Sequence, residues 1–523
     1  MFALVHSDII NKLPCHLFEE RIVMARRERI TPVDTAWLRM DHPNNLMTIV
    51  GVMIFAGKLD IDRLKRTLAA RLLHYPRFRQ KVTSDATGSW WEDDDLFNID
   101  HHLRRTALPG DGGKEELQNL VAELLASPFD HARPLWQFHL IDNYRNGKTR
   151  SSAMILRIHH AIGDGIALIG VVLSLTDPDG ATQVGEVDDS ANGAVEEDED
   201  HGGLWRMLFE PKTGAVIAGI RYSGSLLEKS LSLLTNPGQA LDTIRDGAGI
   251  AVEIAKLAMM PDDAKTRFKG IPGIAKRVAW SEPILLPEVK AVGKTLGCSI
   301  NDVLLSAVSG ALSAYLTEKG EALGEAGIRA LVPVNLRSPG DEGKLGNHFG
   351  MVTLELPAGT KNPLARLHET RSRMEELKHS YQATAALTVL EVVGLLPQIV
   401  QEHVLDLLAS KASVVMTNVP GPRETRFMAG SRIIQQMFWV PQTGNIGMGV
   451  SILSYDGKVQ FGLVSDAGLV PDPERIIACF APEFEKLLYI LLLEPDSPEL
   501  GPEEVEARLS AASKRASLSS RSR

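Results

Sequence analysis

Hydrophobic positions in the first 180 residues follow two different periods. Three stretches are continuous apolar runs of the kind that form buried strands: 46–55, 136–141 and 152–158. Three others carry apolar residues three or four positions apart, which predicts helices: 60–73, 114–125 and 165–175. The polar residues 143–148 indicate a hairpin turn between two of the strands. Strands alternate with helices, which is typical of an α/β fold.

A second α/β pattern begins after Pro283. Its predicted strands are 330–336, 351–356 and 412–416, followed by a hairpin of 445–453 and 458–465. Its predicted helices are 287–296, 303–319 and 364–380, one that starts at Pro473 and a separate one at 482–493. The residues from Ser299 to Asp302 are expected to cap the helix at 303–319.

The segment between the two halves differs from both. Residues 182–203 are acidic and almost free of large apolar residues, which indicates a solvated spacer or an acidic docking site. Residues 204–268 are rich in Ala, Leu and Ile and predict helices that pack between two domains or lie on a lipid surface. The expected division is an N-terminal extension at 1–29, a first domain at 30–203, a helical linker at 204–275, a second domain at 276–505 and a basic tail at 506–523.

Composition narrows the class of protein. A net charge of -10 argues against nucleic acid as the main partner, because phosphate binding needs clustered Lys and Arg. The three cysteines, Cys15, Cys298 and Cys479, form neither a disulfide framework nor a zinc motif, which favours a reducing, intracellular compartment. The longest uncharged run, 433–455, contains Pro, Gln and several Gly, so it predicts strands and turns and no membrane span.

The candidate chemistry lies in the sequence HHAIGDG at 159–165, between a predicted strand and a predicted helix. Gly163 and Gly165 are expected to let the chain turn sharply and approach closely. An imidazole at the end of a buried strand is suited to take and return a proton, and Asp164 would orient the ring or fix the turn. A structural turn and a metal site remain alternatives. A metal site needs three or four converging ligands, and no further His or Cys cluster is visible.

Other motifs follow in a fixed order along the chain. They are PLW at 134–136, ND at 301–302, VPVNLR at 332–337, GN at 346–347, NVPGP at 418–422 and SYDGKVQFG at 454–462, with Asp466 after them. Together with HHAIGDG, this ordered set resembles the bacterial wax ester synthase/diacylglycerol acyltransferase family of CoA-dependent acyltransferases. The resemblance covers roughly residues 30 to 500.

The resemblance implies an α/β fold of two chloramphenicol-acetyltransferase-like domains, each a mixed sheet flanked by helices, with a tunnel between them. It implies that acyl-CoA is a substrate, that no cofactor or metal is needed, and that the acceptor is a fatty alcohol or diacylglycerol. His160 would be the general base, with no covalent acyl-enzyme. His159 would pack or hydrogen-bond beside it. Asp164 would face an Arg, for which Arg337 is the candidate.

Further site residues follow from the same resemblance. Asn301 and Asp302 would border the site, or serve only as a helix cap. Thr417 and Asn418 would offer a hydroxyl or an amide to the oxyanion. Trp136 would shape the tunnel wall.

Two other functions stay open. One is a condensation-type acyltransferase that uses carrier-protein-bound acyl groups, and the other is a non-catalytic lipid-surface protein on the same fold. We expect a cytoplasmic protein that sits peripherally on the inner membrane face or on lipid droplets. The sequence does not define the acyl-chain length, the preferred acceptor or the oligomeric state.

Overall fold

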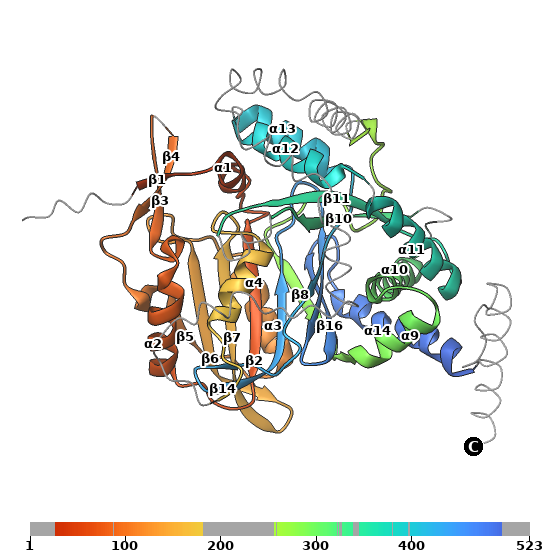
Figure 1. Ribbon diagram of the computed structural model, residues 1–523, viewed down its shortest axis with the longest axis horizontal. Helices are drawn as coiled ribbons and strands as arrows, with labels where there is room; N and C mark the ends of the chain where they lie inside the picture. The colour runs from red at the N-terminus through yellow and green to blue at the C-terminus, as the bar shows by residue number, and fades with distance from the viewer. Residues whose placement is uncertain are drawn as a thin grey trace, which may run out of the picture.

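The computed structural model describes residues 27–493, apart from 87, 181–255, 258, 322, 324–326, 338–344, 379 and 396–397. Most of the predicted extension at 1–29, the acidic stretch, most of the helical linker and the basic tail therefore lie outside the described residues. Two large sheets stand side by side, with helices packed around them (Figure 1).

The N-terminal sheet has six strands in the order β13-β14-β2-β7-β6-β5. Their bounds are β13 (Phe427–Met428), β14 (Ser431–Trp439), β2 (Thr48–Phe55), β7 (Thr149–His159), β6 (Trp136–Asn146) and β5 (Leu103–Thr106). Two of these strands, β13 and β14, come from the C-terminal half of the chain, and β14 pairs antiparallel with β2. Sheet membership therefore does not follow chain order. A small sheet of β1 (Arg27–Arg29), β4 (Gly88–Asp93) and β3 (Gln80–Asp85) lies beside it.

Both faces of the N-terminal sheet are buried, which explains its unbroken apolar runs. Along β2, Ile49 and Met53 face one hydrophobic cluster, while Val50, Val52 and Ile54 face another. The first cluster also includes buried residues of α1 (Pro32–Arg39), α2 (Ile61–Arg71) and α4 (Gly165–Ser174). The second includes α3 (Lys114–Leu125), which packs against β8 (Lys276–Trp280) of the other sheet. The second cluster therefore joins the two halves of the molecule.

The C-terminal sheet has the order β11-β10-β12-β15-β16-β8, and β9 pairs with β16. Its strands are β8 (Lys276–Trp280), β9 (Ile284–Leu285), β10 (Ile328–Asn335), β11 (Phe349–Leu356), β12 (Val414–Pro420), β15 (Met448–Tyr455) and β16 (Lys458–Asp466). The predicted hairpin about residue 456 is present, with φ of 49° at Asp456 and 70° at Gly457. These angles suit a tight two-residue turn.

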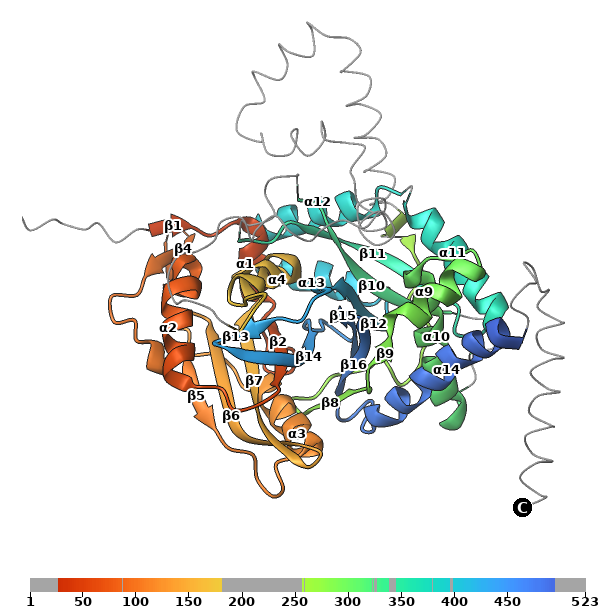
Figure 2. The same cartoon turned by 60° about the horizontal axis from the view of Figure 1, so that its bottom comes forward.

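Helices cover the C-terminal sheet on the side away from the N-terminal half (Figure 2). They are α9 (Leu286–Thr295), α10 (Ile300–Glu318), α11 (Pro363–Lys378) and α14 (Pro473–Leu493). Among the described helices, α10 alone is long and apolar enough to cross a membrane, but 72% of its apolar window is buried in this core. Two further helices, α12 (Gln382–Leu395) and α13 (Gln398–Ala409), form a hairpin that packs on α1.

The prediction of two helices after Pro473 was wrong. A single helix runs from Pro473 to Leu493 with Pro482 inside it. Proline removes one backbone hydrogen bond and disfavours a helix interior. Tertiary packing outweighs that penalty here, because Phe480 and Phe484 are both buried in the core on either side of Pro482.

Candidate active site

The HHAIGDG motif lies where β7 ends and α4 begins. β7 is buried on both faces, so the chain carries His159 and His160 out of the sheet at a fixed place. The backbone N–H of His160 donates to the carbonyl of Met47 at 2.7 Å, which ties the motif to the segment before β2. The residues that complete the site come from α1 and from the segment that enters β11.

The His160 ring is enclosed by aromatic side chains. It stacks on Trp37 of α1, with ring centroids 4.0 Å apart and 12° between the planes, and Phe349 of β11 lies 5.6 Å away. His160 is 4% exposed, and burial lowers the pKa of its imidazole to about 4 although the charge of Asp164 opposes this shift. The ring is therefore neutral at pH 7, which is the form that can accept a proton.

Asn347 fixes which ring nitrogen of His160 carries the proton. Its Oδ1 lies 3.0 Å from His160 Nδ1, and its Nδ2 donates to the His160 carbonyl at 2.8 Å and to Asp34 Oδ1 at 2.7 Å. Because the amide nitrogen must face these two acceptors, the amide oxygen must face Nδ1 and accept from it. The proton is thus on Nδ1, and the lone pair is on Nε2. Among the described residues, Nε2 makes no hydrogen bond and is available to a substrate.

His159 points into a different environment. It is fully buried, its Nδ1 accepts from the N–H of Ala161 at 3.1 Å, and its Nε2 lies 3.7 Å from Asp41 Oδ1. His131 Nε2 lies 3.7 Å from the other Asp41 oxygen. Burial acts to raise the pKa of Asp41, but the two histidines outweigh it and hold that pKa well below its usual range. These contacts direct the His159 ring toward Asp41, and the role of His159 stays a prediction.

Asp164 links the two halves of the molecule. Its Oδ1 accepts from the N–H of Ala167 at 3.0 Å and caps α4. Its Oδ2 accepts from Arg337 Nη1 at 2.5 Å and from the N–H of His348 at 3.0 Å. The Asp164 and Arg337 side chains are only 5% and 1% exposed. The structure therefore contains the ion pair that the family resemblance implied, and it places Asp164 outside hydrogen-bonding range of both imidazole rings.

The backbone conformation at Gly163 and Gly165 does not require glycine, because neither residue has a positive φ. A Cβ at Gly163 would make ordinary contacts with Leu345 and Ala167, and a Cβ at Gly165 would meet nothing within 4 Å. The predicted sharp turn between β7 and α4 is present, but neither conformation in it requires glycine at these two positions. Gly165 instead leaves open space at the start of α4, directly after Asp164.

Four predicted residues of the C-terminal half gather at the start of α10 and the end of β12. Asp302 forms a capping box with Ser299, so it serves as the helix cap. Asn418 Nδ2 donates to Asn301 Oδ1 at 2.8 Å, which brings these two predicted site residues together. Thr417 is 3% exposed and donates to the Val450 carbonyl at 3.4 Å. None of these hydrogen bonds reaches His160, so the oxyanion role of Thr417 and Asn418 stays a prediction.

Trp136 lies in the core and not at an open wall. It is 1% exposed, its ring stacks on His102 with centroids 4.5 Å apart, and its Nε1 donates to the Phe78 carbonyl at 2.9 Å. The tunnel-wall interpretation of Trp136 was wrong. A strand with both faces buried leaves an indole at its start no solvent-filled space to line.

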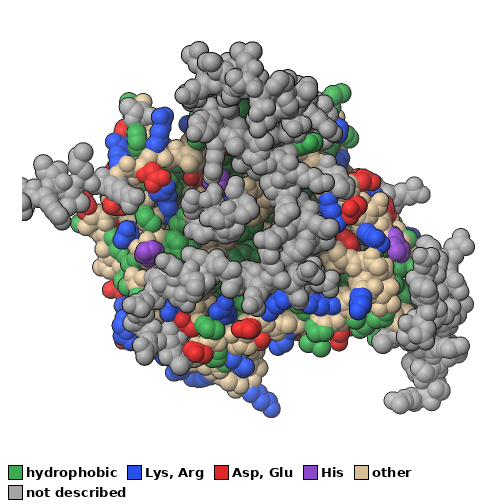
Figure 3. Space-filling model, in the orientation of Figure 1, with side chains coloured by type: hydrophobic (Ala, Val, Ile, Leu, Met, Phe, Trp, Pro, Cys, Tyr) green, Lys and Arg blue, Asp and Glu red, His purple; other side chains and the backbone are tan. Residues whose placement is uncertain are grey.

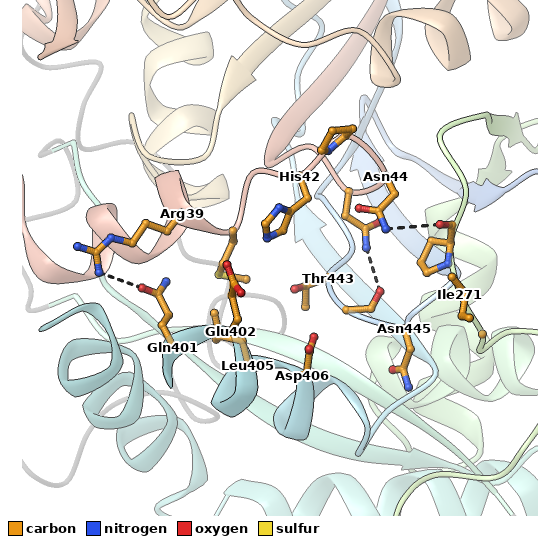
Figure 4. A pocket seen from close by; sticks show the side chains of 16 residues that line it. Arg39, His42, Asn44, Ile271, Gln401, Glu402, Leu405, Asp406, Thr443 and Asn445 are labelled. Carbon is orange, nitrogen blue, oxygen red and sulfur yellow. Dashed lines mark hydrogen bonds between the residues drawn. The ribbon is translucent and has the colours of Figure 1, made fainter. Parts of the chain in front are cut away.

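A cavity of about 680 Å³ is lined by the loop that follows α1, by α13 and by residues 443–445 (Figure 4). Figure 4 shows Arg39 and His42 on one wall, Glu402 and Asp406 of α13 opposite, and Asn445 at one end. Its size is that of a small-molecule site. Neither His160 nor Asn347 lines it, so the His160 ring does not face this cavity. No cluster of three metal-ligating side chains occurs in the described part of the chain.

Several residues that shape the site were missed as functional residues. Asn347 was recognised only as a motif residue, and Asp34 was not assigned to the site. Trp37 and Asp41 carried no sequence signal, because they reach His160 and His159 only through the folding of distant parts of the chain. Asp34 gave no usable signal, because an acid in the first turn of a helix is ordinary in a sequence and its burial, at 3% exposed, appears only in the structure.

Two family models and several known proteins match this chain. Residues 30–304 match the family model described as the wax ester synthase/diacylglycerol acyltransferase catalytic domain, and residues 345–488 match the WS/DGAT C-terminal domain. The chain is 26% identical over 457 residues to the probable diacylglycerol O-acyltransferase tgs1 of Mycobacterium tuberculosis, which covers 86% of this chain and 93% of that protein. It is also 26% identical over 463 residues to tgs2 of the same organism, covering 86% and 96%.

Two solved structures show the same arrangement. A wax ester synthase/diacylglycerol acyltransferase from Marinobacter aquaeolei VT8 superposes with a TM-score of 0.62 at 18% identity, covering 88% of this chain and 99% of that one. The first condensation domain of the calcium-dependent antibiotic synthetase superposes with a TM-score of 0.55 at 13% identity, covering 92% and 98%. The predicted two-domain α/β fold is confirmed.

Proposed function

The chain belongs to the wax ester synthase/diacylglycerol acyltransferase family, and from this premise we propose that it transfers an acyl group from acyl-CoA to the hydroxyl of a long-chain fatty alcohol, a diacylglycerol, or both. The observation that carries this proposal is the hydrogen bond between His160 Nδ1 and Asn347 Oδ1. It leaves the Nε2 lone pair as the basic site of a neutral, buried imidazole.

The transfer needs one base and no covalent acyl-enzyme. His160 Nε2 takes the proton of the acceptor hydroxyl as its oxygen attacks the thioester carbonyl. The tetrahedral intermediate then collapses, the C–S bond breaks, and the CoA thiolate takes the same proton from the imidazolium. Proton transfer by a positioned side chain contributes about 10²–10⁴-fold, and holding two reactants together in a site that excludes water contributes further.

The direct test uses purified protein with labelled palmitoyl-CoA and either hexadecanol or dioleoylglycerol. We expect a labelled ester with at least one acceptor, and no ester above background for His160→Ala. His139→Gln is the matched control, because His139 is also buried with a pKa lowered to about 4 by burial, yet it lies in β6 and has no contact with the motif. Folded protein that forms neither ester refutes the proposal, and transfer only from a carrier-protein thioester would show a condensation-type enzyme.

We also propose that the α12–α13 hairpin contacts an uncharged lipid surface, such as a droplet of ester. Its outer side exposes five large apolar side chains: Val392, Leu395, Ile399, Val400 and Leu407. Neither helix contains Lys or Arg, and their charged residues are acidic. Anionic lipids attract basic segments, so this composition favours neutral lipid over an anionic bilayer. The side of the molecule drawn in Figure 3 carries Lys and Arg as well as Asp and Glu side chains on the described residues around the grey region.

Flotation of the purified protein tests this contact and, with it, the peripheral location that we expect in the cell. We expect the protein to float with triolein droplets more than with anionic phosphatidylglycerol vesicles. The variant Leu395→Glu/Ile399→Glu should lose the droplet binding, because it places two charges where the apolar side chains are most exposed. Equal flotation of the variant, or binding only to anionic vesicles, would contradict the proposed surface.

A further inference from the structure

Asp34 is a buried carboxylate that is linked to the catalytic imidazole through one intervening side chain. It lies in the first turn of α1, where its backbone N–H donates to Thr31 Oγ1 at 3.1 Å. Its Oδ1 accepts from Asn347 Nδ2 at 2.7 Å, and the same amide holds the His160 ring through Oδ1. A line of hydrogen bonds thus joins Asp34, Asn347 and His160, three residues from three separate parts of the chain.

The Asp34 carboxylate has two physical effects on the ring. First, it adds an acceptor for Asn347 Nδ2, and a flipped amide would set its oxygen against this carboxylate. Second, it places a negative charge in a region of low polarity, behind the ring nitrogen that does not face the substrate. A negative charge near an imidazole favours its protonated form, and the interaction is stronger in a buried site than in water.

We propose that Asp34 is a positioning residue for acyl transfer: its carboxylate holds the Asn347 amide in the orientation that protonates His160 Nδ1, and its charge stabilises the imidazolium that forms when Nε2 takes the acceptor proton. This inference rests on the proposed role of His160 as the base. Asp34 acts only through Asn347 and touches no reacting atom.

The charges around Asp34 are few in the described structure. Burial is the largest influence and raises the pKa of Asp34 to about 6, and the hydrogen bond from Asn347 partly offsets it. Arg77, in the short helix η2 (Pro76–Phe78), lowers this pKa, and Asp164 raises it. The helix α12, which packs on α1, carries Glu391 as its one charged residue. Above pH 6 Asp34 is therefore charged, and below it the negative charge is lost.

Asp34→Asn tests the charge while keeping nearly the same shape. We expect kcat to fall about 10- to 100-fold, because the imidazolium loses a charge partner at short range, while KM for palmitoyl-CoA and for the acceptor changes less than about twofold. Wild-type kcat should fall as the pH drops through about 6, and this limb should be absent in the variant. Asp62→Asn is the matched control, since Asp62 lies in the first turn of α2 but is exposed.

A merely structural Asp34 would give a different result. The variant would then lose stability while kcat, KM and the pH profile stayed at wild-type values, and that outcome overturns the inference. If the variant does not fold, the wild-type profile still decides, because the absence of a limb near pH 6 excludes the charge effect.

The ring nitrogens of His160 give a readout that needs no turnover. In ¹⁵N-histidine NMR, assigned with His160→Gln, wild-type protein at pH 7 should show the Nδ1–H tautomer, and Asp34→Asn should shift it toward a mixture. If this shift occurs in a protein that makes no ester, the proposed function fails while the positioning role stands. If ester forms and the tautomer is unchanged, the positioning role fails.

Discussion

The buried ion pair between Asp164 and Arg337 gives the most quantitative prediction. Asp164→Asn keeps an oxygen that can accept from the Ala167 N–H, so the cap of α4 survives. The Arg337 guanidinium stays buried, with its Nη2 still bonded to the Gly346 carbonyl but with no carboxylate for Nη1. Removing one partner of a buried pair costs about 3–5 kcal/mol in the free energy of unfolding. Arg337→Met should cost nearer to 3, because two N–H donors still solvate the remaining carboxylate.

The double variant distinguishes a pair from two separate contributions. With both charges removed, no uncompensated charge is buried, and the loss should be about 0–2 kcal/mol, well below the sum of the single losses. Urea unfolding followed by tryptophan fluorescence measures all three variants. The control is Asp130→Asn at the exposed Arg133–Asp130 pair, which should cost less than about 1 kcal/mol. Additive losses for Asp164 and Arg337 would refute the reasoning.

Three further predictions concern other parts of the molecule. His159→Ala should reduce turnover far less than the 10²–10⁴-fold expected for loss of a base, because its Nε2 faces Asp41; a larger loss than that of His160→Ala would reverse the assignment. Gly394→Ala should destabilise by about 1–3 kcal/mol in thermal unfolding, since its Cβ would overlap the Pro32 carbonyl, whereas Gly170→Ala in α4 has open space and should be neutral or stabilising. Burial lowers the pKa of His139 to about 4, so the folded protein loses stability as the pH falls from 6.5 toward 4 and the unfolded chain takes up a proton that the folded one does not. In His139→Gln, the free energy of unfolding should fall by roughly 3 kcal/mol less over this pH range. An unchanged pH dependence in unfolding curves would contradict this.

The sequence predicted local structure well where periodicity and caps agree. The helix at 114–125 has the expected bounds, and Ser299 caps α10 as its polar side chain indicated. It did not predict the helices α12 and α13, because apolar residues are spread around both helices and leave no clear helical period in the sequence. It also could not pair β14 with β2, because no local property of residues 431–439 indicates a partner nearly 400 residues away.

The candidate site likewise contains some residues that the sequence predicts and others that it does not. His160 and Asp164 could be predicted because strand, turn and helix are all local in the sequence. Asp34, Trp37 and Asn347 could not be given roles, since each reaches the imidazole from a different element and only the packed fold brings them together. A hydrogen bond such as that from Asn347 to Asp34 joins residues 313 positions apart, a separation at which periodicity carries no information.

The insertion of β14 beside β2 has a consequence for synthesis. The N-terminal sheet lacks both β13 and β14 until residue 439 has left the ribosome, about 380 residues after β2 itself. At roughly 5–20 residues per second, the unpaired edge of β2 waits about 20–80 s. An open apolar edge is a template for aggregation. We therefore expect the first 275 residues expressed alone to aggregate, and a split gene to give active protein only when both pieces are made together.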